Sequence, residues 1–414
     1  MVIAILNLLI AIVVSQYLGA AGKGQQSILI TTIAFVLLVC NILGGASLVY
    51  LVPRYDNFKI IAPSYLWTAI VCVVLYFMMG IFQDVPPVYA FHVCLLTLIS
   101  SFTAVNTMIL LGHEKIHAKN LIAVVQTLVL ILSLLFMFIV LDKKSIESYI
   151  ISLYIAFTVV FIISCLYIFK FINVGYGKQS SFSKVLKDMF HYGFLNQLSH
   201  ITQLLSFRLS YYILLLYLGK DSVGIYSNAV ALVESVWLIS KSIATVQYAR
   251  IANSDNDIYS QILTQKLLRS ALFVSFFILL PMALLPSVFY KILFGQEFGS
   301  VNRIIMILAP GVFIYNFSLI IGHYFSGKGR YHINTVASAI GLVVTVGLCW
   351  LLIPLLGIYG AAIAAVFSFI TTAGYVFYIF KKETSFSLKS FFPCKDDINE
   401  YKSYFYSLFS HKQK

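Results

Sequence analysis

Long apolar stretches alternate with short polar ones from one end of the chain to the other. Each apolar stretch holds about 20 residues, which is what an α-helix needs to cross the hydrocarbon core of a bilayer. The polar stretches at 170–192, 248–266 and after Phe380 are the longest, and none could form a soluble catalytic domain. About twelve spans are predicted, at 2–18, 27–52, 61–82, 87–111, 121–141, 148–169, 193–218, 222–247, 267–290, 304–325, 333–354 and 357–380.

The composition indicates the same environment. Of 414 residues, 60% are hydrophobic and only 10% are charged, whereas a soluble domain carries about 25% charged residues. Too little polar surface remains to cover a soluble core of this size, so the natural solvent is lipid, where helices satisfy their own backbone hydrogen bonds. The predicted fold class is therefore an all-α integral membrane protein. The first apolar stretch lacks the positive flank of a signal peptide, and we expect it to be a retained helix.

Lysine and arginine are distributed unequally between the two ends of the predicted spans. The loops, flanks and tail on one side hold 20 of them, and the opposite side holds six, among them Lys23 in the loop between the first two spans. This asymmetry predicts an even number of spans with both termini in the cytoplasm. The net charge of +13 is mainly this topology signal, and we expect no nucleic-acid partner.

The chain also repeats itself. Tyr17-Leu18-Gly19 followed by Gly24 recurs 200 residues later as Tyr217-Leu218-Gly219 followed by Gly224, and the loops 112–117 and 327–332 form a second pair. Two six-helix halves of the same topology predict two lobes around a central cavity, which is an architecture of transporters. The predicted parts are an N-terminal lobe at 1–170, a cytoplasmic linker at 171–192, a C-terminal lobe at 193–380 and a cytoplasmic amphipathic tail at 381–414.

Three charged residues lie well inside the predicted spans, where each is costly and usually faces a cavity or a partner. They are Arg208 in the seventh span, and Glu234 and Lys241 in the eighth. Arg208 either contacts an anion in a water-filled cavity or forms a structural ion pair with Glu234. Glu234 either neutralises Arg208 or Lys241, or binds a coupling proton or sodium ion.

The seventh span also carries a polar face. Asn196, His200 and Gln203 share one helical stripe, and Gln197 and Arg208 align on an adjacent stripe. A face this polar should not point at lipid, so we expect it to line a cavity. The predicted substrate-binding residues are Arg208, Lys241, Asn196, Gln197, His200 and Gln203.

Motifs of enzymes are missing from the chain, which has no nucleophile elbow, phosphate loop or HExxH sequence. His113, Glu114 and His117 lie close together in the sequence, but a solvated loop explains them better than a metal site does. We therefore expect a protein that is not an enzyme, with no catalytic residues, no cofactor and no metal.

Several stretches resemble a known family. YLGAAGKG at 17–24, LVPR at 51–54, RLSYYILLLYLGKDSVGIYSNAVAL at 208–232 and IPLLGIYGAAIAAVFS at 353–368 are similar to segments of polysaccharide transporters, the Wzx-type flippases. The wider superfamily also includes multidrug exporters and the lipid II flippase. The resemblance implies a two-lobed, twelve-helix flippase that moves undecaprenyl-pyrophosphate-linked oligosaccharide, such as the O-antigen unit of lipopolysaccharide, across the bacterial inner membrane.

Two other functions remain open. A drug or cation exporter of the same fold would usually need carboxylates within its spans, and the first half has none. A membrane glycosyltransferase or polymerase would need a sizeable external loop, and the predicted outer loops are short. The flippase interpretation implies lipid-linked oligosaccharide and membrane lipids as partners, with a polysaccharide polymerase and a chain-length regulator as further candidates.

Overall fold

The computed structural model describes residues 2–81, 87–169, 181–254 and 256–384, and all regular structure in these ranges is helical. The predicted tail at 381–414 lies almost wholly outside them. In the first half the helices are α1 (Val2–Gly44), α2 (Ser47–Leu51), α3 (Asn57–Ile81), α4 (Pro87–Gly112), α5 (Ile116–Leu135), the π-helical η1 (Phe136–Val140) and α6 (Ile146–Phe169). In the second half they are α7 (Phe182–Ser235), α8 (Trp237–Ala252), α9 (Asp257–Leu284), α10 (Ser287–Phe294), the 3₁₀ turn η2 (Gln296–Ser300), α11 (Val301–Gly327), α12 (His332–Leu356) and α13 (Ile358–Glu383).

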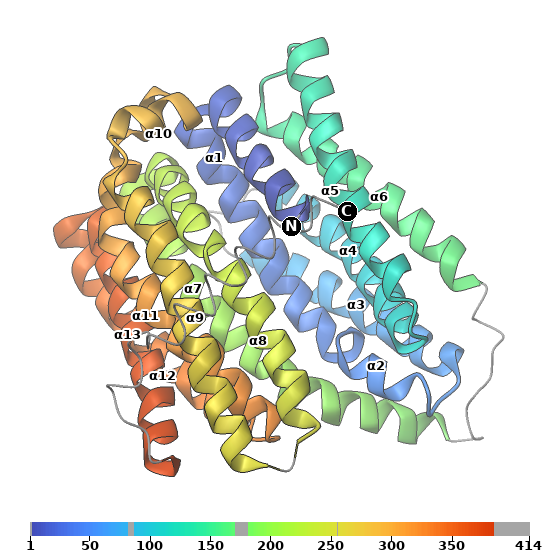
Figure 1. The fold of residues 1–414 in the computed structure, drawn as a ribbon. Coiled ribbons are helices and arrows are strands. Elements are labelled where there is room, and N and C mark those ends of the chain that lie inside the picture. Colours follow the sequence, from blue (N-terminus) through green and yellow to red (C-terminus); the bar gives the residue numbers. More distant parts are fainter. Residues whose placement is uncertain (1, 82–86, 170–180, 255, 385–414) are drawn as a thin grey trace, which may run out of the picture. The chain divides into compact units, whose positions relative to one another are not determined.

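Helices α1 and α7 are hairpins, each bent at one glycine. Gly19 has φ 67° and ψ −169°, and Gly219 has φ 78° and ψ −176°, a conformation open to glycine because it has no Cβ. Tyr211 and Tyr226 lie on opposite sides of Gly219, and their ring centroids are 5.8 Å apart, whereas a straight helix would separate them by about 22 Å. Figure 1 shows α1 likewise turning back on itself.

The number of spans agrees with the prediction. Ten helices in the described residues are long and apolar enough to cross a membrane. Because α1 and α7 each contain two arms, these ten helices provide twelve arms. The sequence pattern therefore correctly identified an all-α membrane protein with about twelve transmembrane helices.

Three details of the prediction were wrong. The loop expected at 19–26 is absent, since the second arm of α1 begins directly after Gly19. Helix α7 begins at Phe182, although its predicted span began at 193, because apolar content marks the part in lipid and not the end of a helix. The ninth span was predicted to reach 290, but α9 ends at Leu284 and α10 begins after Pro286, because proline disfavours helical backbone in the residue before it.

The chain packs as two compact units, which we describe separately. The first takes the described residues up to Asn228 together with Ser287–Val301 and Ile353–Ile358, and the second takes Ala229–Pro286, Asn302–Leu352 and the described residues from Tyr359 onward. The predicted lobes follow from the repeat and not from packing, and they remain a prediction.

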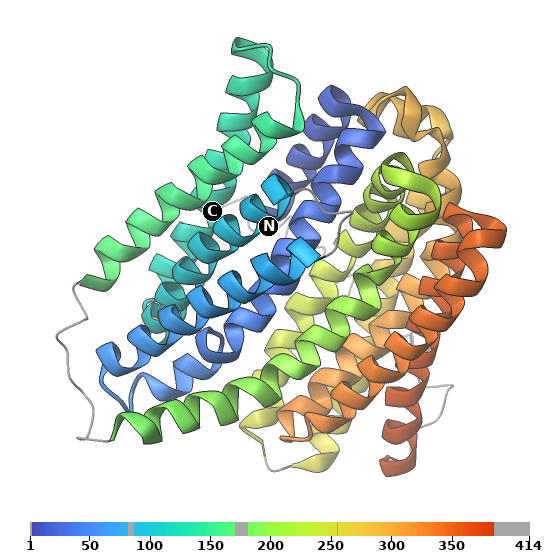
Figure 2. The same ribbon diagram turned by 180° about the vertical axis from the view of Figure 1, so that it is seen from behind.

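The first unit is built on α1, which packs against α3, α4 and α5. One core cluster unites both arms of α1 with these helices, and includes Val14, Leu29, Cys72, Val93 and Leu134. Figure 2 shows α3 and α4 running beside each other, and α5 and α6 form a second such pair. Helices α10 and η2, from the second half of the sequence, also pack on α1 in this unit.

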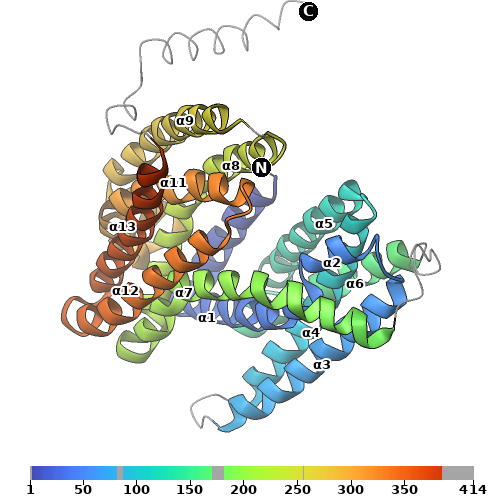
Figure 3. The same ribbon diagram turned by 90° about the horizontal axis from the view of Figure 1, so that it is seen from below.

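The second unit contains α8, α9 and most of α11, α12 and α13 (Figure 3). Trp237 is buried at its centre, where the indole N–H donates to the Val312 carbonyl at 3.0 Å. The Trp237 ring lies 4.6 Å from the Tyr315 ring and 5.3 Å from the Phe369 ring, measured between centroids. A single aromatic cluster thus joins α8, α11 and α13.

Candidate functional site

The polar face predicted from the sequence lies on the first arm of α7. Gln197 is buried, with 4% of its surface exposed, while His200 is exposed and Gln203 is half-buried. Asn196 belongs to the same helix, but its side chain lies outside the described residues. The arm therefore presents polar side chains that the protein only partly covers.

Arg208 lies further along the same arm and is half-buried. Its guanidinium carbon is 5.4 Å from the centre of the Tyr211 ring, within the range of a cation–π interaction. Its Nη1 atom also contacts the Phe207 carbonyl at 3.4 Å. The Tyr211 ring also packs against the Tyr226 ring on the other arm of the hairpin. The Arg208 guanidinium therefore lies beside a tyrosine ring that is itself held in place by packing.

Glu234 and Lys241 lie in the second unit, near the end of α7 and on α8. Glu234 is half-buried, and Lys241 is exposed with its ammonium 5.9 Å from the centre of the Trp237 ring. Arg208 belongs to the first unit. An ion pair between Arg208 and Glu234 therefore remains a prediction.

A polar contact between the two halves of the sequence was missed by sequence reasoning. In the first unit, Ser27 Oγ donates to Ser227 Oγ at 2.8 Å, and Asn228 Nδ2 donates to Ser15 Oγ at 2.7 Å. Ser27 and Ser227 are separated by 200 residues, which is also the offset between the two glycine motifs. The repeat was therefore the signal that could have located this contact.

Two glycines allow the helices to meet beside these serines. A Cβ atom on Gly24 would lie 1.9 Å from the Lys220 carbonyl oxygen, and one on Gly224 would lie 2.0 Å from the Ala20 carbonyl oxygen. No side chain fits at either distance, so the second arms of α1 and α7 approach backbone to backbone. Glycine is used in this way where membrane helices cross most closely.

The segment α10–η2 forms hydrogen bonds with residues on both sides of the turn at Gly19. The Ala20 N–H donates to Glu297 Oε2 at 2.6 Å, at the start of the second arm of α1. Gln16 Nε2 donates to the carbonyls of Ile292 and Leu293 at 2.8 and 3.0 Å. A carboxylate at the beginning of a helix is favourable because the free N–H groups there carry partial positive charge.

Lys23 corrects another expectation. It was placed in an outer loop, but it is a helical residue with only 6% of its surface exposed. Its ammonium donates to Gln26 Oε1 at 2.6 Å, and Gln26 Nε2 donates in turn to the Tyr149 hydroxyl at 3.1 Å. The helix continues through this position because the single glycine at 19 makes the turn without a loop.

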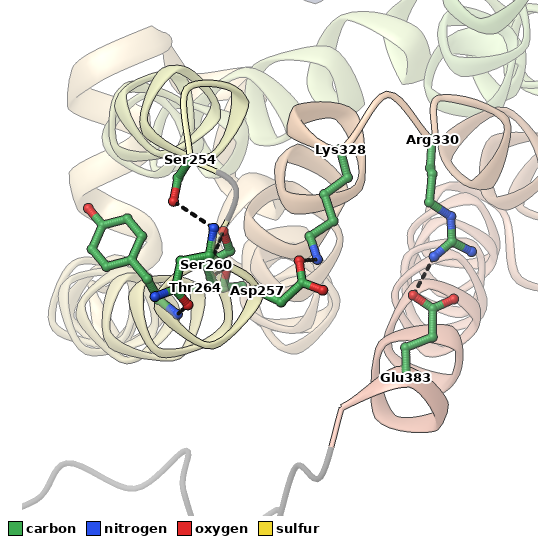
Figure 4. Close-up of polar contacts among 9 residues, drawn as sticks. Ser254, Asp257, Ser260, Thr264, Lys328, Arg330 and Glu383 are labelled. Atoms are coloured by element: carbon green, nitrogen blue, oxygen red, sulfur yellow. Dashed lines mark hydrogen bonds and ion pairs between the residues drawn. The ribbon is translucent and has the colours of Figure 1, made fainter.

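The loop 328–331 of the second unit carries two ion pairs (Figure 4). Lys328 Nζ lies 2.6 Å from Asp257 Oδ1, at the start of α9, and Arg330 contacts Glu383, at the end of α13. Burial lowers the pKa of Lys328, but the hydrogen bonds and charges of Asp257 and Tyr324 together outweigh burial and raise the pKa. The hydrogen bond to Glu383 raises the pKa of Arg330. These two ion pairs thus connect the loop to α9 and to α13.

The equivalent loop of the first half holds the histidines considered as a metal site. His113 Nε2 lies 3.0 Å from Asn57 Nδ2, and burial together with the charge of Lys115 lowers the pKa of His113. The histidine therefore favours its neutral form and accepts this hydrogen bond. Over the described ranges, no three His, Cys, Asp or Glu side chains gather in an arrangement that could hold a metal ion.

Solved structures define the fold of the chain. A MATE-family multidrug resistance transporter of the MOP superfamily, in its inward-facing conformation, superposes with a TM-score of 0.73 at 15% identity, over 92% of this chain and 94% of that chain. The lipid II flippase MurJ, in an inward closed conformation, gives 0.73 at 17% identity, over 94% and 87%. The chain thus has the fold of MOP-superfamily transporters, and at these identities the comparison establishes the fold alone.

The comparison with protein families is more specific than the comparison of folds. The profile of the polysaccharide biosynthesis protein family matches residues 1–253, and the chain belongs to this family. The capsular polysaccharide biosynthesis protein CapF of Staphylococcus aureus is 26% identical over 40% of this chain and 42% of its own length. The uncharacterized membrane protein MJ1068 of Methanocaldococcus jannaschii is 28% identical over 45% and 38%. The matched segment is less than half the length of either relative.

Proposed function

We propose that this protein is a flippase, which moves undecaprenyl-pyrophosphate-linked oligosaccharide across the bacterial inner membrane by alternating access. The cargo would be a repeat unit of O-antigen or of another surface polysaccharide. The observation that carries the proposal is Arg208, a cation held beside a polar face within a membrane-spanning arm, in a chain of the polysaccharide biosynthesis family.

The chemistry of such a substrate fits these side chains. A diphosphate is costly to move through hydrocarbon unless a cation and hydrogen-bond donors replace its water. Arg208 offers a planar pair of donors to phosphate oxygens, with Lys241 as a second, weaker cation. Asn196, Gln197, His200 and Gln203 supply hydrogen-bonding groups for sugar hydroxyls, while the polyprenyl tail remains in lipid.

Alternating access requires contacts that form at one end of the molecule and break again. In our proposal both termini are cytoplasmic, so that Gly19 and Gly219 lie at the outer ends of their hairpins. The Ser27–Ser227 contact and the crossing at Gly24 and Gly224 would then close the outer side. Glu234 would neutralise Arg208 or Lys241. A polysaccharide polymerase and a chain-length regulator would act on the delivered unit.

A multidrug or cation exporter of the same superfamily is the second candidate. The MATE transporter and the lipid II flippase have the same TM-score of 0.73, so the fold favours neither function. Glu234 supplies a carboxylate of the kind that binds a cationic drug. The family match over residues 1–253 is the reason to prefer a polysaccharide precursor.

Complementation of a deletion strain tests the proposal. Arg208→Ala should abolish surface polysaccharide and accumulate lipid-linked units while the protein level is unchanged, and Arg208→Lys should restore part of the activity because charge is kept but the paired donors are lost. Arg303→Ala, at an exposed arginine on α11, is the matched control. Full activity of Arg208→Ala, or altered drug sensitivity with normal polysaccharide, would overturn the proposal.

A further inference from the structure

The first arm of α7 is longer than a membrane span. It runs from Phe182 to the residue before Gly219, which at 1.5 Å per residue is about 55 Å. The hydrocarbon core is about 30 Å thick and needs about 20 residues. Since the apolar stretch begins at 193, the first three turns, Phe182–Tyr192, extend beyond the hydrocarbon. We call this segment the α7 extension.

One side of the α7 extension is docked onto the first unit. Val185 and Met189 are both 0% exposed and join a cluster with Leu48 and Val52. The Tyr55 hydroxyl donates to Asp188 Oδ2 at 2.5 Å, and this hydrogen bond raises the pKa of Tyr55. The α7 extension therefore has a fixed orientation, and its other side faces away from the protein.

The outward side carries a row of large apolar side chains spaced four residues apart. Phe182, Leu186 and Phe190 are 52, 39 and 46% exposed, and Phe194, one turn beyond the α7 extension, continues the row at 42%. The rings of Phe190 and Phe194 are stacked with centroids 5.6 Å apart. An exposed row of this kind on a helix outside the hydrocarbon would be unfavourable in water, but it suits the boundary between lipid headgroups and acyl chains.

Basic and tyrosine side chains flank this row. Lys184 and Lys187 are exposed on the α7 extension itself. At the end of α2 and just after it, the Arg54 guanidinium lies 3.5 Å from the centre of the Tyr50 ring. The ring centroids of Tyr50 and Tyr192 are 5.1 Å apart. Asp188, the acid within the α7 extension, is engaged by Tyr55. The flank thus combines cations with the aromatic residues that concentrate at membrane interfaces.

We propose that the α7 extension lies in the membrane interface and binds acidic phospholipids of the cytoplasmic leaflet. Lys184, Lys187 and Arg54 would contact the headgroup phosphates, and the phenylalanine row would enter the acyl boundary. The charge of the leaflet complements that of the patch, because an acidic surface attracts the lysine and arginine side chains next to it. The inference rests on the proposed orientation of the chain and not on the cargo.

Tryptophan fluorescence in bilayers tests this binding. The full chain carrying Phe190→Trp is reconstituted with brominated phosphatidylcholine or with brominated phosphatidylglycerol. The measured quantity is the fluorescence quenching in excess of that of the unmodified protein, which has three native tryptophans. We expect quenching by both lipids, with the acidic lipid preferred about threefold or more. Lys184→Gln with Lys187→Gln should reduce the preference to about one. Lys143→Gln with Lys144→Gln, at an exposed pair in the loop after η1, should leave the preference unchanged.

Three outcomes would overturn the inference. Excess quenching of zero would show that Phe190 is not in contact with lipid. Equal quenching by the two lipids in the otherwise native chain would show that the segment has no preference for acidic headgroups. Loss of the preference when a short-chain polyprenyl diphosphate is added in equimolar amount would assign the patch to the transport substrate instead. The proposed flippase activity is unaffected by the first two outcomes.

Discussion

Single residues determine how closely the two halves of the sequence approach. The missing side chains of Gly24 and Gly224 let one backbone touch another, whereas Gly347 lies in α12 with nothing within 4 Å of an added Cβ. The same substitution should therefore have opposite consequences at these sites, because alanine normally favours a helix by about 1 kcal/mol over glycine.

We predict that Gly24→Ala or Gly224→Ala lowers the melting temperature of the purified protein and abolishes complementation. The added Cβ would overlap a carbonyl oxygen at 1.9 or 2.0 Å, and forced overpacking costs about 1–3 kcal/mol. Gly347→Ala should be neutral or slightly stabilising. Unchanged melting of both Gly24→Ala and Gly224→Ala in detergent would show that the crossing is looser than described.

His113 gives the protein a pH-dependent stability. Its pKa is lowered in the folded protein by burial and by Lys115, so the unfolded chain takes up the proton first, near the ordinary value of about 6.5. The contribution of neutral His113 to the free energy of unfolding is therefore fully present above about pH 6.5 and decreases as the pH falls below that value. Melting temperatures between pH 7.5 and 5 should fall less for His113→Gln than for the unmodified protein. His332→Gln, at an exposed histidine that begins α12, should behave as the unmodified protein does.

Elements were more predictable than their connections. Apolar stretches identified the spans because lipid imposes a minimum length on every helix, and α4, α12 and α13 lie within a few residues of their predicted positions. The length of the connection at Gly19 was misjudged because polar residues at 20–26, Lys23 among them, suggested a loop. A hydropathy profile does not take into account that a lysine can be buried in a helix when it donates a hydrogen bond to a neighbour such as Gln26.

The polar face of α7 was recognisable in the sequence for a related reason, while its role in binding a substrate remains a prediction. A polar or charged residue in a span is rare enough to be noticed, and Gln197, Gln203 and Arg208 are indeed on one membrane arm. The contacts around Glu297 were not predictable, because a loop carboxylate gives no sign of the distant backbone N–H that it binds.

The cap supplied by η2 should contribute measurably to the stability of α1. Glu297→Gln removes the negative charge beside the Ala20 N–H, and we expect a loss of about 1 kcal/mol or less, since the side chain is largely exposed. Unfolding in a denaturing detergent measures it. Glu147→Gln, an exposed acid in the first turn of α6, controls for the general effect of a charge near a helix start, and an equal loss there would argue against a specific cap.

At the scale of the whole molecule, the proposed transport cycle requires the contacts of the first unit to be temporary. The Ser27 and Ser227 oxygens are 2.8 Å apart, so cysteines at these positions should form a disulfide after small adjustments. In a background without the native cysteines, oxidation of Ser27→Cys with Ser227→Cys should stop flipping in liposomes, and a reductant should restore it.

Two controls make the cross-linking experiment decisive. Ser27→Ala with Ser227→Ala removes the hydrogen bond without allowing a cross-link, and it should keep most of the activity with or without oxidant. Ser27→Cys alone should also be insensitive to oxidant. Full activity of the oxidised double cysteine protein, with the disulfide verified by mass spectrometry, would mean that the two hairpins never separate during transport.

The turn at Gly19 also affects how the protein is made. Two arms joined by one residue leave almost no segment for the insertion machinery to export between them. We therefore expect the two arms to enter the bilayer as a pair, and we expect the same of the arms on either side of Gly219. A ribosome that stalls between the arms of either pair would therefore leave the first arm unable to take up its final position until synthesis of the second resumes.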